Sequence, residues 1–130
     1  MNRTLTCLLL LAAALPLFGV EPGEKAPPFA NPDLASRHVL SRDCLGKGWL
    51  LVDFFATDPA GQAVVEPYFR DNPTALTVLL DRYQATVKRY GVSEIPSLFL
   101  IDPAGIVVLK QVGFQEGLYE RIRALLPADD

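Results

Sequence analysis

The segment "WLLVDFFA" (49–56) constrains the fold of this chain more than any other stretch of its sequence. All of its residues except one aspartate are apolar, which is typical of a strand buried on both faces of a parallel sheet. The turn "TDPAGQ" (57–62) follows, and "GQAVVEPYFRD" (61–71) predicts a short helix kinked at Pro67. Ligands of open α/β sheets bind where a strand's carboxyl end meets the next helix, so a functional site is first expected at this turn.

The rest of the chain continues the alternation of strands and helices. "RYQATVKRYGV" (82–92) predicts a helix that ends at Gly91, and "QEGLYERIRALL" (115–126) predicts a final amphipathic helix. Further strands are expected in "ALTVLLD" (75–81), "IPSLFLID" (95–102) and "IVVLKQVGF" (106–114). The last two form an antiparallel hairpin because only "PAG" separates them, whereas a helical crossover makes the first two strands parallel.

The segment 21–48 is rich in proline and glycine and predicts a short N-terminal hairpin at the edge of the sheet, with His38 on its surface. Together these elements predict an α/β domain. Its central mixed sheet is expected to have about four to five strands and to be flanked by helices.

The first 20 residues are not expected to belong to this domain. They hold one arginine and then an apolar run, the pattern of a secretory signal peptide, so the folded domain is predicted to span residues 21–130. An uncleaved anchor is the alternative, although a membrane span needs about 20 apolar residues. Cys7 lies inside the run and is expected to leave with it. The protein is thus predicted to be exported and to be periplasmic or secreted.

Composition excludes several classes of function. The net charge is −3, and basic residues are interspersed with acidic ones. We therefore expect neither nucleic acid nor, beyond the signal segment, a membrane as a partner. After that segment Cys44 is the only cysteine, which excludes an internal disulfide and a dithiol centre within one chain. No metal site is predicted around Cys44, and no pattern in the sequence indicates a cofactor.

Several segments, taken in order, resemble the thioredoxin superfamily. More narrowly, they resemble its exported thioredoxin-like redoxins, the branch shared with thiol-specific antioxidant proteins. The resemblance rests on "GEKAPPFANPDL", "LSRDCLGKGWLLVDFFAT", "LLDRYQATVKRYGVSEIPSLFLIDPAG" and "VGF". Pro67 also falls where the active-site helix of this family is kinked. The resemblance implies a thioredoxin-like fold in which a cis peptide bond precedes Pro96.

The departure from this family lies at its C-x-x-C motif, which the resemblance places in "DPAGQ". Pro59 occupies the position of the first cysteine, Gln62 that of the second, and Asp58 that of the preceding aromatic residue. Thiol–disulfide exchange needs a thiolate, so no catalytic residue is expected here and enzymatic activity is left open. We interpret Asp58 as the N-cap of a helix that is shorter than its counterpart in the family.

Two residues remain as weak candidates for catalysis. Asp53 resembles the family's buried carboxylate, which accepts a proton from the second cysteine, and burial should raise its pKa. Without that thiol, we interpret Asp53 as an inherited buried polar group rather than as a general acid or base. We interpret Cys44 as an inert thiol, because antioxidant relatives carry the reactive cysteine after the central strand. An intermolecular disulfide or a peroxide-reactive thiol at Cys44 is the alternative.

The segments that resemble the family remain although its two cysteines are absent, and this favours binding over catalysis. In thioredoxin-like proteins the cis-proline turn exposes backbone groups that pair with an extended peptide. The expected binding residues are Phe55, Asp58, Ile95, Pro96 and Ser97. Most aromatic side chains are expected in the core, including Tyr83, whereas the shortened helix should leave Phe55 and Tyr68 partly exposed.

The sequence therefore supports three hypotheses. The first is a non-catalytic module of the cell envelope that binds an extended peptide or an envelope protein. The alternative is a thiol-dependent redox protein, either a thiol–disulfide oxidoreductase or an antioxidant-type protein, acting through Cys44. A degenerate paralogue without an activity of its own is the third.

Overall fold

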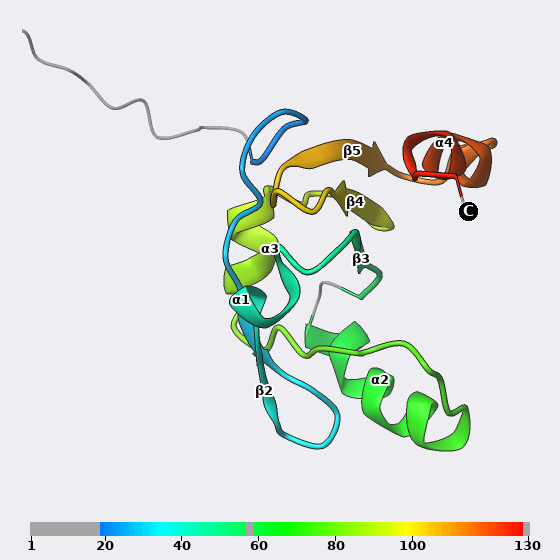
Figure 1. Ribbon diagram of the computed structural model, residues 1–130. Helices are drawn as coiled ribbons and strands as arrows, with labels where there is room; N and C mark the ends of the chain where they lie inside the picture. Colours follow the sequence, from blue (N-terminus) through cyan, green and yellow to red (C-terminus); the bar gives the residue numbers. More distant parts are fainter. Residues whose placement is uncertain (1–18, 57–58, 129–130) are drawn as a thin grey trace, which may run out of the picture.

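The computed structural model describes residues 19–56 and 59–128, which fold into strands and helices in alternation (Figure 1). The strands of this part of the chain are β1 (Ala30–Pro32), β2 (His38–Leu40), β3 (Leu50–Phe54), β4 (Ser97–Ile101) and β5 (Val107–Val112). Its helices are α1 (Ser41–Cys44), α2 (Pro59–Asp71), α3 (Ala85–Tyr90) and α4 (Leu118–Leu125). The predicted α/β fold class is confirmed, and no helix among these residues is long and apolar enough to cross a membrane.

The strands form two antiparallel sheets. β1 and β2 make the predicted N-terminal hairpin, in which Asn31 is opposite Val39 and His38 is exposed. The larger sheet has the order β3-β4-β5, with Phe54 opposite Ser97 and Ser97 opposite Val112. The predicted hairpin of the last two strands is thus confirmed.

The segment 75–81 differs from the prediction, because it is not a strand beside β3. Both backbone groups of Leu80 are engaged by the hairpin: its N–H donates to the Pro32 carbonyl at 2.8 Å, and its carbonyl accepts from Asn31 Nδ2 at 3.2 Å. Leu79 makes a single antiparallel bridge to Asp33. The predicted parallel pair is therefore wrong, since the hairpin takes the backbone groups that such a ladder would need.

The main core lies between the larger sheet and α3. Tyr90 and Phe99 are completely buried, with ring centroids 5.1 Å apart, and Phe54 packs against both. The Tyr90 hydroxyl donates to the Pro27 carbonyl at 3.0 Å, and burial raises its pKa to about 12. The buried members of this core cluster are Val20, Ala26, Phe29, Tyr90, Phe99, Ile101 and Val107. We refer to these seven residues as the core cluster.

The chain before residue 21 contributes to this core. Val20 is only 4% exposed, and Gly19 lies against Gly91, the left-handed residue that ends α3. A Cβ on either glycine would collide with the backbone of the other. Glycine is therefore needed at position 91 for two reasons. Its φ of 68° is left-handed, and the close approach of Gly19 leaves no room for a Cβ.

The two faces of β3 differ in exposure. Leu50, Val52 and Phe54 are half-buried against the core cluster, whereas Leu51, Asp53 and Phe55 on the opposite face are exposed. The prediction of a strand buried on both faces is therefore wrong. The physical reason is the position of the helices, because α2 lies below the sheet in Figure 1 and α4 lies beyond the end of β5.

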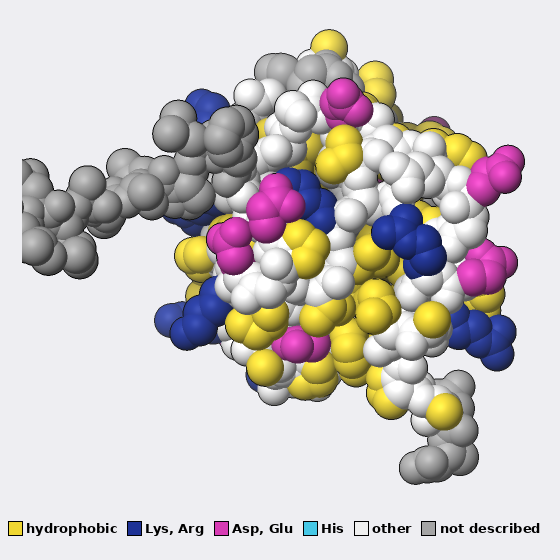
Figure 2. Space-filling view, turned by 90° about the horizontal axis from the view of Figure 1, so that it is seen from above, with side chains coloured by type: hydrophobic (Ala, Val, Ile, Leu, Met, Phe, Trp, Pro, Cys, Tyr) yellow, Lys and Arg dark blue, Asp and Glu magenta, His cyan; other side chains and the backbone are white. Residues whose placement is uncertain are grey.

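α2 packs on a second, smaller cluster instead of on the sheet. Val65 from α2 is buried there with Val78 and Leu80 of the segment after the helix. Pro67 lies inside α2, as the sequence predicts. The helix ends at Asp71, immediately before Asn72–Pro73. On the face of the molecule shown in Figure 2, basic and acidic side chains are interspersed around hydrophobic ones, without a large area of one charge.

Candidate binding surface

The end of β3 and the loop before β4 meet at one edge of the larger sheet. Because Phe54 is opposite Ser97, the antiparallel register places Phe55 opposite Pro96. The Ile95–Pro96 peptide bond is cis, and the Ile95 side chain is 43% exposed. Each of the two segments thus has an apolar side chain next to Pro96. Phe55 follows β3, and Ile95 precedes Pro96 in the loop.

The backbone of this loop is only partly engaged. The Pro96 carbonyl accepts from the Gly113 N–H at 2.8 Å, which attaches the loop to the end of β5. Within the described part of the chain, the amide and the carbonyl of Ile95 have no hydrogen-bond partner. Unpaired backbone groups are the groups with which an added extended segment pairs in other proteins.

Ser97 plays a different part from Ile95 and Pro96. It is buried, and its hydroxyl donates to the Glu94 carbonyl at 2.6 Å, which closes the loop from the inside. Its position in β4 is paired on both sides, with Phe54 and with Val112. Of the three loop residues singled out in the sequence, Ile95 and Pro96 are exposed and Ser97 supports them.

Aromatic residues of α2 continue the exposed surface. Phe69 contacts Phe55, with ring centroids 6.1 Å apart, and also Tyr68, with centroids 5.1 Å apart. Phe55 is 45% exposed and Tyr68 is 58% exposed, as the sequence predicts. We call the four residues Phe55, Tyr68, Ile95 and Pro96 the cis-proline surface.

Asp53 lies two residues before Phe55, on the same face of β3, and it is exposed. The prediction of a buried carboxylate is therefore wrong. The strand turns its side chain to the uncovered face of the sheet. The surrounding protein still removes part of its hydration, and this desolvation raises the pKa of the Asp53 carboxyl above its ordinary value. Nothing among the described residues donates a hydrogen bond to this carboxyl from a side chain.

Comparisons with known proteins agree with this architecture. No family model and no curated protein sequence matches the chain. Among solved structures, a putative thiol:disulfide interchange protein DsbE from Chlorobium tepidum is 27% identical, with a TM-score of 0.62, over 82% of this chain and 98% of that one. The thioredoxin domain of a thiol-disulfide oxidoreductase from Bacteroides vulgatus has a TM-score of 0.62 and 20% identity, covering 84% of this chain and 100% of that one.

A third similar structure is the pneumococcal exposed lipoprotein thioredoxin of Streptococcus pneumoniae, with a TM-score of 0.60 and 18% identity. It matches 76% of this chain and 100% of its own. This chain is a thioredoxin-superfamily protein. The resemblance places the C-x-x-C motif of this superfamily at the start of α2.

Pro59 and Gln62 both lie in the first turn of α2, and neither residue type carries a thiol. Asp58, the predicted N-cap and binding residue, lies outside the described residues, as do the side chains of Pro59 and Gln62. The two cysteines of the whole sequence are Cys7 and Cys44. Cys44 is the only one of them among the described residues, so this part of the chain holds no pair of cysteines for an exchange reaction.

Cys44 is the last residue of α1, and its side chain is half-buried against the core cluster. Sequence reasoning placed it in a loop, whereas the structure places it on a four-residue helix that packs beside β2. Within residues 19–56 and 59–128, no three His, Cys, Asp or Glu residues gather closely enough to hold a metal ion.

Sequence reasoning missed two exposed residues. Tyr83 was expected in the core but is 89% exposed, because it lies in the turn between the segment 75–81 and α3. Leu51 was also expected to be buried and is exposed on the open face of β3. Exposure alternates along β3, but almost all of its residues are apolar. The sequence therefore does not indicate which face of the strand is exposed.

Proposed function

We propose that this thioredoxin-fold protein is an exported, non-catalytic module that binds an extended peptide or a segment of an envelope protein at the cis-proline surface. One observation carries the proposal: the unpaired amide and carbonyl of Ile95 lie between exposed apolar side chains. An extended peptide would pair with these backbone groups and place apolar side chains against Phe55 and Tyr68.

The proposal excludes thiol–disulfide exchange at α2 as the function. A helix start favours a thiolate through its free N–H groups and dipole, but the residues at the two cysteine positions are Pro59 and Gln62. The site has the cis-proline loop, which contacts the substrate in a thioredoxin, and it lacks the cysteine that attacks the substrate disulfide. Binding without turnover is the function that these residues support.

Export is part of the proposal and carries one structural constraint. Val20 is a core residue and Gly19 packs against Gly91. A signal peptidase cut after Val20 would remove a buried side chain, so the proposed cleavage leaves Gly19 and Val20 on the mature chain. Intact mass of the protein recovered from the cell envelope tests this: a mature chain that begins at Glu21 would contradict it.

The binding proposal is tested with a displayed library of random ten-residue peptides. Enriched peptides are synthesised, and their affinity is measured for the wild type, Phe55→Ala and Ile95→Ala. Each variant should bind about tenfold or more weakly, because central contacts of an interface contribute the largest share of affinity. Leu76→Ala, at an exposed leucine after α2, is the matched control and should bind like the wild type.

Two outcomes would contradict the proposal. The first is a library without enriched peptides, and the second is a set of peptides whose affinity is unchanged by both Phe55→Ala and Ile95→Ala. Unfolding of each variant is followed by circular dichroism, so that a loss of binding is separated from a loss of fold.

A further inference from the structure

The apolar area around Pro96 continues beyond the cis-proline surface to the end of β5. β4 lies between β3 and β5, so Pro96 has Phe55 on one side and Gly113 on the other. The Gly113 N–H donates to the Pro96 carbonyl at 2.8 Å, and Phe114, the next residue, is 86% exposed. The unpaired backbone groups of Ile95 therefore lie in a loop with an exposed phenylalanine on either side.

The charged side chains that border this area are nearly all acidic. The segments 53–56, 64–71, 94–97 and 113–116 form or border it, and they contain five acidic residues and one basic residue, Arg70. Their net charge is therefore −4, although the whole chain has a net charge of −3. The five acidic residues, all of them exposed, are Asp53, Glu66, Asp71, Glu94 and Glu116.

Nothing in the described chain neutralises these five carboxylates. Within residues 19–56 and 59–128, both salt bridges join other residues, and no hydrogen bond reaches any of the five. Arg121 of α4 contacts the last of the four segments, but its guanidinium donates to Gln111 and Gln115. The negative charge around the apolar area is therefore open to a cation from outside the protein.

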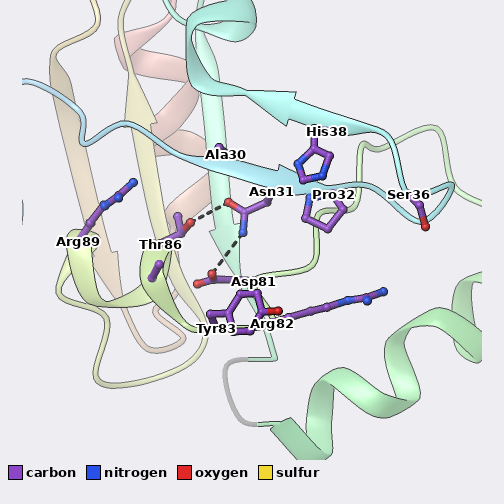
Figure 3. Close-up of a pocket in the computed structure, with 11 residues that line it drawn as sticks. Ala30, Asn31, Pro32, Ser36, His38, Asp81, Arg82, Tyr83, Thr86 and Arg89 are labelled. Carbon is purple, nitrogen blue, oxygen red and sulfur yellow. Dashed lines mark hydrogen bonds between the residues drawn. The ribbon is translucent and has the colours of Figure 1, made fainter.

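The hairpin side of the molecule differs, because its acidic side chain is bound by the protein itself. A cavity of about 420 Å³ lies there between the hairpin β1–β2 and the segment 81–89 (Figure 3). Asp81 accepts from Asn31 Nδ2 at 3.2 Å and from a backbone N–H of α3 at 2.8 Å. The exposed residues that line this cavity include Arg82, Tyr83 and Arg89. Two arginines of the chain therefore lie at a cavity that none of the four residues of the cis-proline surface lines.

Asp53 connects the charge with the apolar area most directly. It lies two residues before Phe55, on the same face of β3. The surrounding protein removes part of its hydration and raises the pKa of its carboxyl. A cation beside a partly dehydrated carboxylate is screened less by water than one beside a fully hydrated carboxylate. A basic side chain next to an apolar one therefore suits this position.

We propose that the cis-proline surface binds a cationic extended peptide, in which lysine or arginine residues flank the apolar side chains. The apolar side chains contact Phe55, Ile95 and Phe114, and the basic ones pair with the carboxylates of Asp53 and Glu94. This inference rests on the proposed peptide-binding function and adds the chemical class of the peptide. An acidic peptide is rejected, because it would bring like charges together.

The library of random ten-residue peptides gives the first test. Enriched peptides should contain lysine and arginine at least about twice as often as the unselected library, and aspartate and glutamate less often. In the most enriched peptide, each replacement of a basic residue by glutamine should weaken binding about two- to fivefold, and replacement by glutamate should weaken it more. Raising the NaCl concentration from about 50 to about 500 mM should weaken binding severalfold.

Variants of the protein locate the charge that the peptide recognises. Asp53→Asn and Glu94→Gln should each weaken binding of the most enriched peptide about two- to fivefold, and the double variant about tenfold. Glu24→Gln is the matched control, because Glu24 is exposed and its carbonyl accepts from Val107, at the opposite end of β5 from Gly113. It should bind the peptide like the wild type. All three positions are exposed, so the variants should fold like the wild type.

The outcomes separate this inference from the proposed function. Enriched peptides that depend on Phe55 but have no excess of basic residues would overturn the inference alone. The same holds if the double variant binds as tightly as the wild type, or if Glu24→Gln loses as much affinity as Asp53→Asn. A library without enriched peptides would overturn the proposed function and this inference together.

Discussion

The two faces of the β3–β4–β5 sheet differ most at β3, which is covered on one face and exposed on the other. On the covered face, Phe54 and Phe99 pack edge to face at 5.9 Å, and Phe99 is inaccessible to solvent. On the opposite face, β4 and β5 still bury Leu100 and Leu109, whereas β3 exposes Leu51 and Asp53, and the exposed Phe55 follows the strand. The comparison teaches that β3 is covered on one face only, and that its other face is left available for binding.

The difference arises from the helices and not from the strands. α3 and the segment around Val20 lie against the covered face, whereas α2 packs on Val78 and Leu80. α4 contacts the open face through Arg121, which donates to Gln111 near the end of β5. α4 itself has no buried residue. The open part of the sheet therefore begins at Leu51 and leads to the cis-proline surface.

The largest expected effect separates two phenylalanines on opposite faces. Phe99→Ala should lower the free energy of unfolding by about 3–5 kcal/mol, because it empties a site in the centre of the core cluster. Phe55→Ala should change it by less than about 1 kcal/mol, because this side chain is already 45% exposed. Urea denaturation followed by circular dichroism measures both. Equal losses in the two variants would show that the open face is covered in solution.

The second effect concerns the segment that completes the covered face. A chain that begins at Glu21 should be about 2 kcal/mol less stable than one that begins at Gly19, since it lacks the buried Val20 side chain. The same denaturation measurement compares the two chains. Equal stability would remove Val20 from the covered face and permit signal cleavage after that residue.

Cys44 tests how tightly the covered face is closed. Its thiol packs against the core cluster, so alkylation by iodoacetamide should be at least about tenfold slower in the folded chain than in urea. Cys44→Ala should lower stability by only about 1 kcal/mol, because cysteine packs as a small hydrophobic residue. Rapid alkylation, or a mixed disulfide on Cys44 in protein trapped at acid pH, would favour the redox alternative instead.

The smallest effect is expected on the open face, at Asp53. Its pKa is raised in the folded chain by desolvation, so folding favours the protonated form. The wild type should therefore lose stability relative to Asp53→Asn as the pH rises from below the ordinary carboxyl pKa through the folded pKa. Above that range the difference stays constant. Denaturation of both proteins between about pH 3 and pH 7 measures it, and a difference of the opposite sign would contradict the desolvation of this side chain.

The candidate site could be predicted from the sequence only in part. The exposure of Phe55 and Tyr68 and the places of Ile95 and Pro96 follow from the pattern around two apolar segments. The burial of Ser97 and the exposure of Asp53 do not follow, because each depends on which face of a strand another element covers. The cavity beside Tyr83 has no local sequence signal, since its residues come from segments about 50 positions apart.

The sequence by itself determined the places of β3, α2, α3 and α4, the hairpin of β4 and β5, the end of α3 at Gly91 and the residue types in the first turn of α2. These are local properties, set by hydrophobic periodicity, by the φ that glycine permits and by side-chain chemistry. Only the tertiary structure decided which face of β3 is covered, that Leu80 pairs with the hairpin instead of with β3, and that Val20 belongs to the core. Each of these depends on hydrogen bonds and packing between distant segments, whose competition for the same backbone groups and apolar surface no local pattern records.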